Sequence, residues 1–385
     1  MNVSVGSKTV WSSLVEARND RLHAEGRWRH PVTFDARGPE GVLTEDGDKV
    51  VAFASNDYLG LSMHPSVIAA AHAALDLWGS GAGASRLVTG SRPCHEELEQ
   101  ELASWKGTER AVVFPTGFAA NLGVLCAFAD GGVRICSDEL NHASIVDGAR
   151  LSRAEVVVYR HGDVDHLESL LDQAPGPTLV VTDVVFSMDG DVAPVREIAD
   201  ACRRHGALLV LDEAHDVLGP DIGPALAGVD VLRVGTLSKT LGSLGGFVAG
   251  TRPFIDHLEN RARSYIFTTA PTPADAAAAL AALRVLVSPE GTALRARLAA
   301  HVESVAPGHT SPIIPVVLGS DERAVVASAV LRHHGVWVPA IRPPTVPPGT
   351  ARLRVTLSAA HTAEHIALLL EALRAVSPVG SPPSP

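Results

Sequence analysis

Short apolar runs alternate with segments of helical composition through the middle of the chain. The runs are rich in Val, Leu and Ile, with few polar positions, and lie at residues 111–114, 134–136, 155–159, 178–183 and 207–211. Such runs are typical of strands that are buried on both faces of a parallel sheet. Segments between them, such as residues 194–205, have the composition of helices. The pattern predicts an α/β fold with a mostly parallel central sheet and helices on both faces.

The flanking segments predict a second part of the molecule. Helices are predicted at residues 10–29, 65–78 and 273–286, with another around Leu98–Trp105. Beyond them an α+β succession is predicted, with strands at residues 313–317, 336–338 and 352–357 and helices at residues 322–333 and 362–376.

These elements predict four regions along the chain. We expect an N-terminal arm at residues 1–55, a large domain at 56–290 and a small C-terminal domain at 291–376 that packs with the arm. The remaining residues, 377–385, are rich in Pro and Ser, so they are expected to form a disordered tail.

Composition narrows the classes of function. The 385 residues carry a formal net charge of −11 and are 46% hydrophobic, which allows a large core and argues against a nucleic-acid or anionic-membrane surface. The four cysteines, Cys94, Cys126, Cys136 and Cys202, have no metal-site spacing, so we expect no metal. The N-terminus lacks an apolar signal core, and no apolar run reaches membrane-spanning length. We therefore expect a cytoplasmic protein.

One lysine stands in an unusual place. Residues 235–246, Gly-Thr-Leu-Ser-Lys-Thr-Leu-Gly-Ser-Leu-Gly-Gly, lie between apolar runs at 231–234 and 247–249, which places Lys239 in a turn between strands. The chain has only three other lysines and uses arginine for the rest of its basic charge. Lysine can act as a base or form a Schiff base, and arginine cannot.

Polar residues at the ends of predicted strands form a candidate site. Asp183, Asp212 and the loop after Phe114 all stand where ligands bind in open α/β sheets. Asp212 followed by Glu213 also fits a nucleotide-dependent helicase, but no phosphate loop of the form G-x-x-x-x-G-K-[ST] accompanies it. Singly, Asp212 could cap a helix, His215 could be a core histidine and Ser187 a turn hydroxyl.

Together the residues favour pyridoxal 5′-phosphate (PLP) chemistry. A PLP enzyme needs a lysine for the Schiff base, an acid beside the pyridine nitrogen and neutral donors for the phosphate. Lys239 and Asp212 supply the first two. The hydroxyls of Thr236 and Ser238, with the amides that follow Thr116 at a helix start, suit a phosphate dianion.

Five motifs carry a resemblance to a known family. They are residues 55–61 (Ser-Asn-Asp-Tyr-Leu-Gly-Leu), 141–144 (Asn-His-Ala-Ser), 185–191 (Val-Phe-Ser-Met-Asp-Gly-Asp), 211–215 (Leu-Asp-Glu-Ala-His) and 236–242 (Thr-Leu-Ser-Lys-Thr-Leu-Gly). The chain resembles the α-oxoamine synthase family of fold-type I PLP-dependent transferases from its arm to about Val376. Members condense an amino acid with an acyl thioester and release CO₂.

The segment 341–354 and Arg27 resemble one branch of the family most. That branch joins L-alanine to a pimeloyl thioester, carried by coenzyme A or a carrier protein, in biotin biosynthesis. A branch that uses glycine with an acetyl or succinyl thioester is the alternative. A binding or regulatory protein on the same fold is a further alternative, and the full set of Lys239, Asp212, His142 and Arg354 argues against it.

The resemblance implies a role for each cofactor residue. Lys239 would form the Schiff base and remove the α-proton, Asp212 would pair with the pyridine nitrogen, and His142 would stack on the ring. The remaining contacts to the ring hydroxyl or the phosphate would come from Ser187, His215, Gly117, Phe118 and Thr236.

Substrate and partner contacts are implied in the same way. Arg354, with Asn56, would bind the amino acid, and Arg27 and Thr345 would contact the thioester. A homodimer is implied, with Thr268 and Thr269 reaching the partner's phosphate.

The sequence departs from the family pattern at three features. Asp216 stands where glycine is common, Phe118 where tyrosine is frequent, and the segment 216–234 is shorter than usual. These departures concern the substrate and the rate more than the cofactor.

Overall fold

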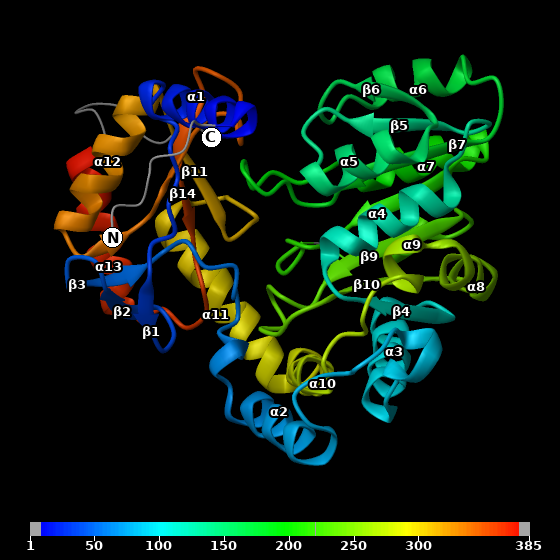
Figure 1. Cartoon of the computed structure of the whole chain (residues 1–385), viewed down its shortest axis with the longest axis horizontal. Helices are drawn as coiled ribbons and strands as arrows, with labels where there is room; N and C mark the ends of the chain where they lie inside the picture. The colour runs from blue at the N-terminus through cyan, green and yellow to red at the C-terminus, as the bar shows by residue number, and fades with distance from the viewer. Residues whose placement is uncertain (1–8, 220, 377–385) are drawn as a thin grey trace.

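A computed structural model describes residues 9–219 and 221–376 (Figure 1). The expected tail at 377–385 lies outside the described residues. A seven-stranded sheet runs in the order β4-β10-β9-β8-β7-β5-β6, and only β10 is antiparallel to its neighbours. Its strands are β4 (Arg110–Phe114), β5 (Arg134–Asp138), β6 (Glu155–Tyr159), β7 (Thr178–Asp183), β8 (Leu208–Asp212), β9 (Val231–Thr236) and β10 (Gly246–Gly250).

Helices cover both faces of this sheet. Alternate strand residues point to opposite faces, so Val181 packs in one apolar cluster and Val180 in another. The first face is covered by α4 (Gly117–Phe128), α5 (Ala143–Ser152), α8 (Arg252–Arg261) and α9 (Arg263–Ile266). The second face is covered by α2 (Pro65–Trp78), α3 (Pro93–Lys106), α6 (Val164–Asp172), α7 (Val195–His205) and α10 (Pro273–Leu286). The predicted α/β class is confirmed.

Two smaller sheets form the other part of the molecule (Figure 1). One joins β1 (Phe34–Ala36), β2 (Glu40–Leu43) and β3 (Asp48–Ala52) to β12 (Val336–Trp337), and the other has the order β11 (Ile313–Gly319), β14 (Ala351–Thr356), β13 (Ala340–Ile341). Helices α11 (Pro289–Val305), α12 (Asp321–His333) and α13 (Ala363–Val376) accompany them. Because β3 pairs with β12, the N-terminal strands belong to the same layer as the C-terminal part.

The chain also differs from the expected elements in places. Helix α1 (Val10–Ala24) ends before the expected Arg29, and Gly26 follows its end with a positive φ of 63°. None of its residues is buried. Strands β1 and β2 and helix α11 were not predicted. The expected boundary between residues 290 and 291 falls in the first turn of α11, and the domain boundaries stay predictions.

Short helical turns complete the described chain: η1 (Leu61–Met63), η2 (Arg86–Gly90) and η3 (Gly223–Leu226). Within residues 9–219 and 221–376, no single helix has the length and apolar character to span a membrane, and α10 with α11 meets both tests only as a pair bent by 78°.

Candidate active site

The carboxyl ends of the parallel strands bring the predicted polar residues together. Asp183 ends β7 opposite Asp212 at the end of β8, and Asp212 lies opposite Val234 of β9. Strand β4 leads into α4 at Gly117, and β9 leads through Thr236 to Lys239. A cavity of about 200 Å³ opens at this edge. Its lining includes the predicted residues Gly117, Phe118, His142, Ser187, Asp212, His215, Thr236 and Lys239.

Lys239 is held by a neutral histidine. Its Nζ lies 2.7 Å from His215 Nε2, and the Nδ1 atom of His215 lies 2.5 Å from the hydroxyl of Tyr58. Burial lowers the pKa of His215 well below its ordinary value, and the positive charge of Lys239 lowers it further. A neutral imidazole that accepts from Lys239 at Nε2 carries its proton on Nδ1, so the ring donates to Tyr58. Tyr58 then donates to Asn56 Oδ1 at 3.3 Å.

The pKa of Lys239 is lowered below its ordinary value. Loss of water around the amine is the main cause, and the charge of Arg354 acts in the same direction, while Asp212 and Asp183 oppose it. A lowered pKa increases the share of neutral amine, which can accept a proton or attack a carbonyl.

Asp212 is buried and receives hydrogen bonds from neutral donors. Asn121 Nδ2 lies 2.6 Å from its Oδ2, and the amide of Ala214 donates to its Oδ1 at 2.9 Å. Asn121 also donates to Ser144 Oγ at 2.9 Å, and Ser144 Oγ lies 2.7 Å from His142 Nδ1. Asn121 therefore links the carboxylate of Asp212 to the ring of His142.

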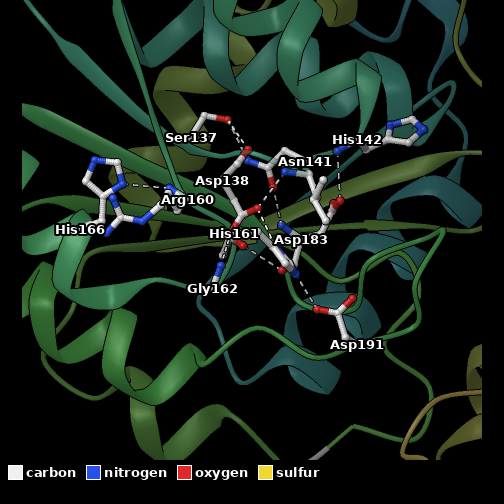
Figure 2. A network of polar contacts seen from close by, with 12 residues as sticks. Ser137, Asp138, Asn141, His142, Arg160, His161, Gly162, His166, Asp183 and Asp191 are labelled. Carbon is white, nitrogen blue, oxygen red and sulfur yellow. Dashed lines mark hydrogen bonds and ion pairs between the residues drawn. The ribbon is translucent and has the colours of Figure 1, made fainter. Parts of the chain in front are cut away.

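His142 is the N-cap residue of α5 and lines the same cavity. Its amide donates to Asp183 Oδ2 at 3.0 Å, and Asn141 Oδ1 accepts from the amide of Asp183 at 2.9 Å (Figure 2). Burial lowers the pKa of His142 and raises the pKa of Asp183 well above its ordinary value, and the nearby Asp212 raises the latter further. The loop at the end of β5 is thus joined to the end of β7.

Arg354 of β14 brings the small part of the molecule to the site. Its Nε donates to the carbonyl of Ser187, and Nη2 donates to Asn56 Oδ1 at 3.1 Å. Nη1 donates to Thr356 Oγ1 at 2.9 Å. The predicted residues Arg354 and Asn56 are therefore connected to the Lys239 cavity through Ser187 and through Tyr58.

Besides Arg354 and Asn56, four predicted residues do not line this cavity. Arg27 is exposed and pairs with Glu25 at 3.3 Å, and the exposed Thr345 accepts from Arg29 at 3.4 Å. Thr268 is half-buried and Thr269 is exposed, just after α9. The roles expected for the two pairs, in thioester binding and in the partner's site, stay predictions.

The residues fit a PLP group. The amides of Gly117 and Phe118 precede the first bond within α4, and that end of a helix attracts a phosphate dianion. The backbone is held there closely, because a Cβ on Gly246 would lie 2.6 Å from the backbone of Gly117. Thr236 donates to the carbonyl of Gly245 at 3.0 Å, so the hydroxyl of Ser238, 2.7 Å away, donates to Thr236 Oγ1. An amine, a carboxylate and a helix N-terminus thus line one cavity.

Sequence reasoning gave no role to several residues that the structure places here. Asn121 is a lone polar residue in the apolar helix α4, and this contrast is the signal that could have identified it. Tyr58 and Ser144 stood in the quoted motifs without a role. Asp183 was noted only as a strand end.

Asp216 lies on another side of the β8 end. It lines a second cavity, of about 310 Å³, with Lys106, Glu213 and Arg233. Phe118 remains at the first cavity, where its side chain is 44% exposed.

Known proteins are similar to the chain over most of its length. Residues 48–373 match the family described as aminotransferase class I and II. The 8-amino-7-oxononanoate synthase of Anaeromyxobacter dehalogenans is 50% identical, with 96% of this chain and 97% of that protein covered. The enzyme of the same name from Burkholderia mallei is 47% identical, with 88% and 91% covered.

Solved structures agree with this similarity. A serine palmitoyltransferase from S. paucimobilis, with bound PLP-myriocin aldimine, has a TM-score of 0.88 and 32% identity, with 96% of this chain and 98% of that chain covered. An 8-amino-7-oxononanoate synthase from Francisella tularensis has a TM-score of 0.70 and 28% identity, with 85% and 96% covered.

Proposed function

The chain belongs to the aminotransferase class I and II family, and we propose that it is a PLP-dependent 8-amino-7-oxononanoate synthase. It would condense L-alanine with a pimeloyl thioester, with loss of CO₂, in biotin biosynthesis. The observation that carries the proposal is the cavity in which Lys239, Asp212 and His142 meet. Relatives that bear this enzyme's name, at 47% to 50% identity, support the choice of reaction.

PLP, when bound, supplies an electron sink for the charge that develops at the amino acid's α-carbon. Lys239 Nζ would accept the α-proton, and burial favours this role because it lowers the pKa of the amine and so increases the share of neutral base. Asp212, whose carboxylate lines the same cavity, would pair with the pyridine nitrogen and favour its protonated form. His142, which lines the same cavity, would stack on the ring of the bound cofactor and limit its movement.

Arg354 binds the carboxylate of the amino acid. Its guanidinium offers a planar fork that matches a carboxylate, and no acid pairs with it among residues 9–219 and 221–376. Asn56 orients the fork by accepting from Nη2. Gly117, Phe118 and the hydroxyls of Thr236 and Ser238, which line the cavity, would hold the phosphate.

The thioester and the partner subunit complete the proposal. Arg27 and Thr345 contact the thioester substrate, whether coenzyme A or a carrier protein delivers it. The enzyme acts as a homodimer, with Thr268 and Thr269 beside the partner's phosphate site. Exposed apolar side chains near these threonines, including Phe267 at 69% exposure, are consistent with a covered surface.

A substrate panel tests the proposed reaction. The purified protein with PLP is given L-alanine and pimeloyl-CoA, glycine with acetyl-CoA or succinyl-CoA, and L-serine with palmitoyl-CoA. The serine pair is included because the TM-score to the serine palmitoyltransferase structure is 0.88. We expect release of CoA and CO₂ with the first pair at a kcat/KM at least about tenfold above the others. Turnover with another pair alone would refute the proposed substrates.

A further inference from the structure

Three charged side chains from separate elements meet behind the site (Figure 2). Asp138 ends β5, His161 follows β6, and Asp191 follows the turn after β7. His161 Nδ1 lies 2.9 Å from Asp138 Oδ1, and Nε2 lies 2.7 Å from Asp191 Oδ2. Because both ring nitrogens face carboxylates, an imidazolium can donate to both. Hydrogen bonds to Asp138 and Asp191 raise the pKa of His161 to about 10, which is consistent with a protonated ring.

On one side, Asp138 shapes the loop that carries His142. Its side chain is 1% exposed, and its oxygens also accept from the amides of Leu140 at 2.9 Å and Gly162 at 3.0 Å. The loop then places Asn141 and His142 against the end of β7, through the two bonds to Asp183. A shift of the Asp138 carboxylate would therefore move His142.

On the other side, Asp191 closes the turn that carries Ser187. The amide of Phe186 donates to the carbonyl of Asp191 at 3.0 Å, and the ring of Phe186 packs edge-on against His161 at 4.4 Å between centroids. The second oxygen of Asp191, Oδ1, is buried without a hydrogen-bond partner in the described chain, so His161 is the partner that this carboxylate has there.

We propose that His161 is a positioning residue that joins the His142 loop (residues 138–142) to the Ser187 turn (residues 186–191). Its positive charge holds two carboxylates that would otherwise repel each other, and the two segments carry side chains to the same cavity. The carbonyl of Ser187 in this turn accepts a hydrogen bond from Arg354 Nε, so His161 also affects the orientation of that guanidinium. The role in catalysis rests on the proposed function, but the structural link does not.

The first measurement is amide hydrogen exchange of the full-length, PLP-free protein. In His161→Gln, we expect exchange at both 138–142 and 186–191 to rise by about tenfold or more, because the two segments lose their common cation. The matched control is His166→Gln, since the Nδ1 atom of His166 accepts from the amide of Arg160 at 3.0 Å and touches neither carboxylate (Figure 2). It should exchange like the wild type. Unchanged exchange in His161→Gln would overturn the proposal.

The second measurement separates charge from packing. With PLP and substrates, His161→Gln should lower kcat/KM by about 10- to 100-fold, as expected for a displaced catalytic group. Adding Asp191→Asn removes one of the two repelling charges, so the double variant should recover several-fold in activity. A ring that only fills space predicts no recovery, and that result would refute the role of the charge.

A third variant covers the case that His161→Gln does not fold. Asp191→Asn alone, at a side chain that is 43% exposed, should loosen 186–191 and leave 138–142 protected. If residues 186–191 stay as protected from exchange as residues 138–142 in Asp191→Asn, the proposed link through His161 is wrong. If exchange changes as expected but the wild type turns over no substrate pair, the proposed function fails and the positioning role stands.

Discussion

Two pairs of basic side chains in this molecule have opposite surroundings. Lys106 faces Glu213 at 2.5 Å, and Arg352 pairs with Asp189. Lys239 contacts the neutral His215, and Arg354 donates only to neutral oxygens among residues 9–219 and 221–376. A cation that loses water needs a compensating charge, so the first pair serves the fold. The second pair has no such partner within the described chain, so it is available for the chemistry of the site.

Two neighbouring acids show the same contrast. Glu213 lies between Lys106 and Arg233, whose Nε is 2.5 Å from its Oε1. Burial alone would raise the pKa of Glu213, but these two cations lower it below its ordinary value. Asp212, one residue earlier, accepts hydrogen bonds from the side chain of Asn121 and the amide of Ala214, and both donors found in the described part of the chain are neutral. One strand end therefore carries a structural ion cluster on one side and the candidate site on the other.

The largest effect is expected for Lys239→Ala. Loss of the proposed base should lower kcat by at least about 1,000-fold, because general-base groups contribute up to about 10⁴-fold. The variant should fold as well as the wild type, since Lys239 has no acid partner in the described chain. Steady-state kinetics and a thermal unfolding curve of the PLP-free protein measure the two effects. Activity within tenfold of the wild type would place Lys239 outside the chemistry.

Lys106→Met should show the reverse pattern. It leaves Glu213 with Arg233 alone, so the free energy of unfolding should fall by about 3 kcal/mol. The kcat of the folded fraction should change by less than about threefold, because Lys106 does not line the Lys239 cavity. Urea unfolding at pH 7.5 gives the stability, and Lys49→Met, at an exposed lysine, is the control. Equal stability of the two variants would remove the contrast between the lysines.

Arg354→Lys tests the difference between Arg354 and Arg352. A lysine cannot bind a carboxylate with a planar fork, so KM for L-alanine should rise by about 10- to 100-fold. KM for the acyl thioester should change much less. The matched variant is Arg352→Lys. Arg352 lies two residues from Arg354 on β14, and its substitution weakens the ion pair with Asp189. If Arg352→Lys raises KM for alanine as much as Arg354→Lys, direct carboxylate binding by Arg354 is wrong.

The smallest effect is expected for Asp216, which lines the same cavity as Lys106, Glu213 and Arg233. Burial, with the charge of Glu213, raises the pKa of Asp216 from 3.8 to about 6. A carboxyl with a raised pKa binds its proton more tightly in the folded state, so this stabilisation is present below pH 4 and is lost as the pH rises through 6. Asp216→Asn should therefore be more stable than the wild type by roughly 1–2 kcal/mol above pH 7, and the gain should disappear at pH 4.

Unfolding curves between pH 4 and pH 8 test this prediction. Asp221→Asn, at an exposed residue of the same loop, is the control and should show no such trend. A gain for Asp216→Asn that does not vary with pH would show that its charge is not the cause.

Much of the fold could be predicted, because the strands of the parallel sheet are continuous apolar runs, even in the edge strand β6, where only Tyr159 is buried. The bounds predicted at 155–159 and 178–183 match β6 and β7, and those at 65–78 and 273–286 match α2 and α10. Strands β1 and β2 are short and half exposed, so they lack such a run. Helix α11 has charges spread around an apolar stripe, and its pattern did not stand out.

The site was predictable where chemistry demands a residue type. Lys239, Asp212 and His142 follow from the motifs, and the structure brings them to one cavity. The supporting contacts were not predictable in the same way. Asn121 reaches Asp212 across 91 positions of sequence, and His161 reaches Asp191 across 30. Such partners depend on which strands become neighbours, and local spacing does not encode that order.

The central claim is that Lys239 is the lysine that bonds the cofactor. The most direct test is to incubate the purified protein with PLP, reduce it with borohydride and identify the modified peptide by mass spectrometry. We predict a visible absorbance band that is lost on reduction and a pyridoxyl group on Lys239, with Lys106 unmodified. A pyridoxyl group on Lys106 or another residue, or none at all, would contradict the account.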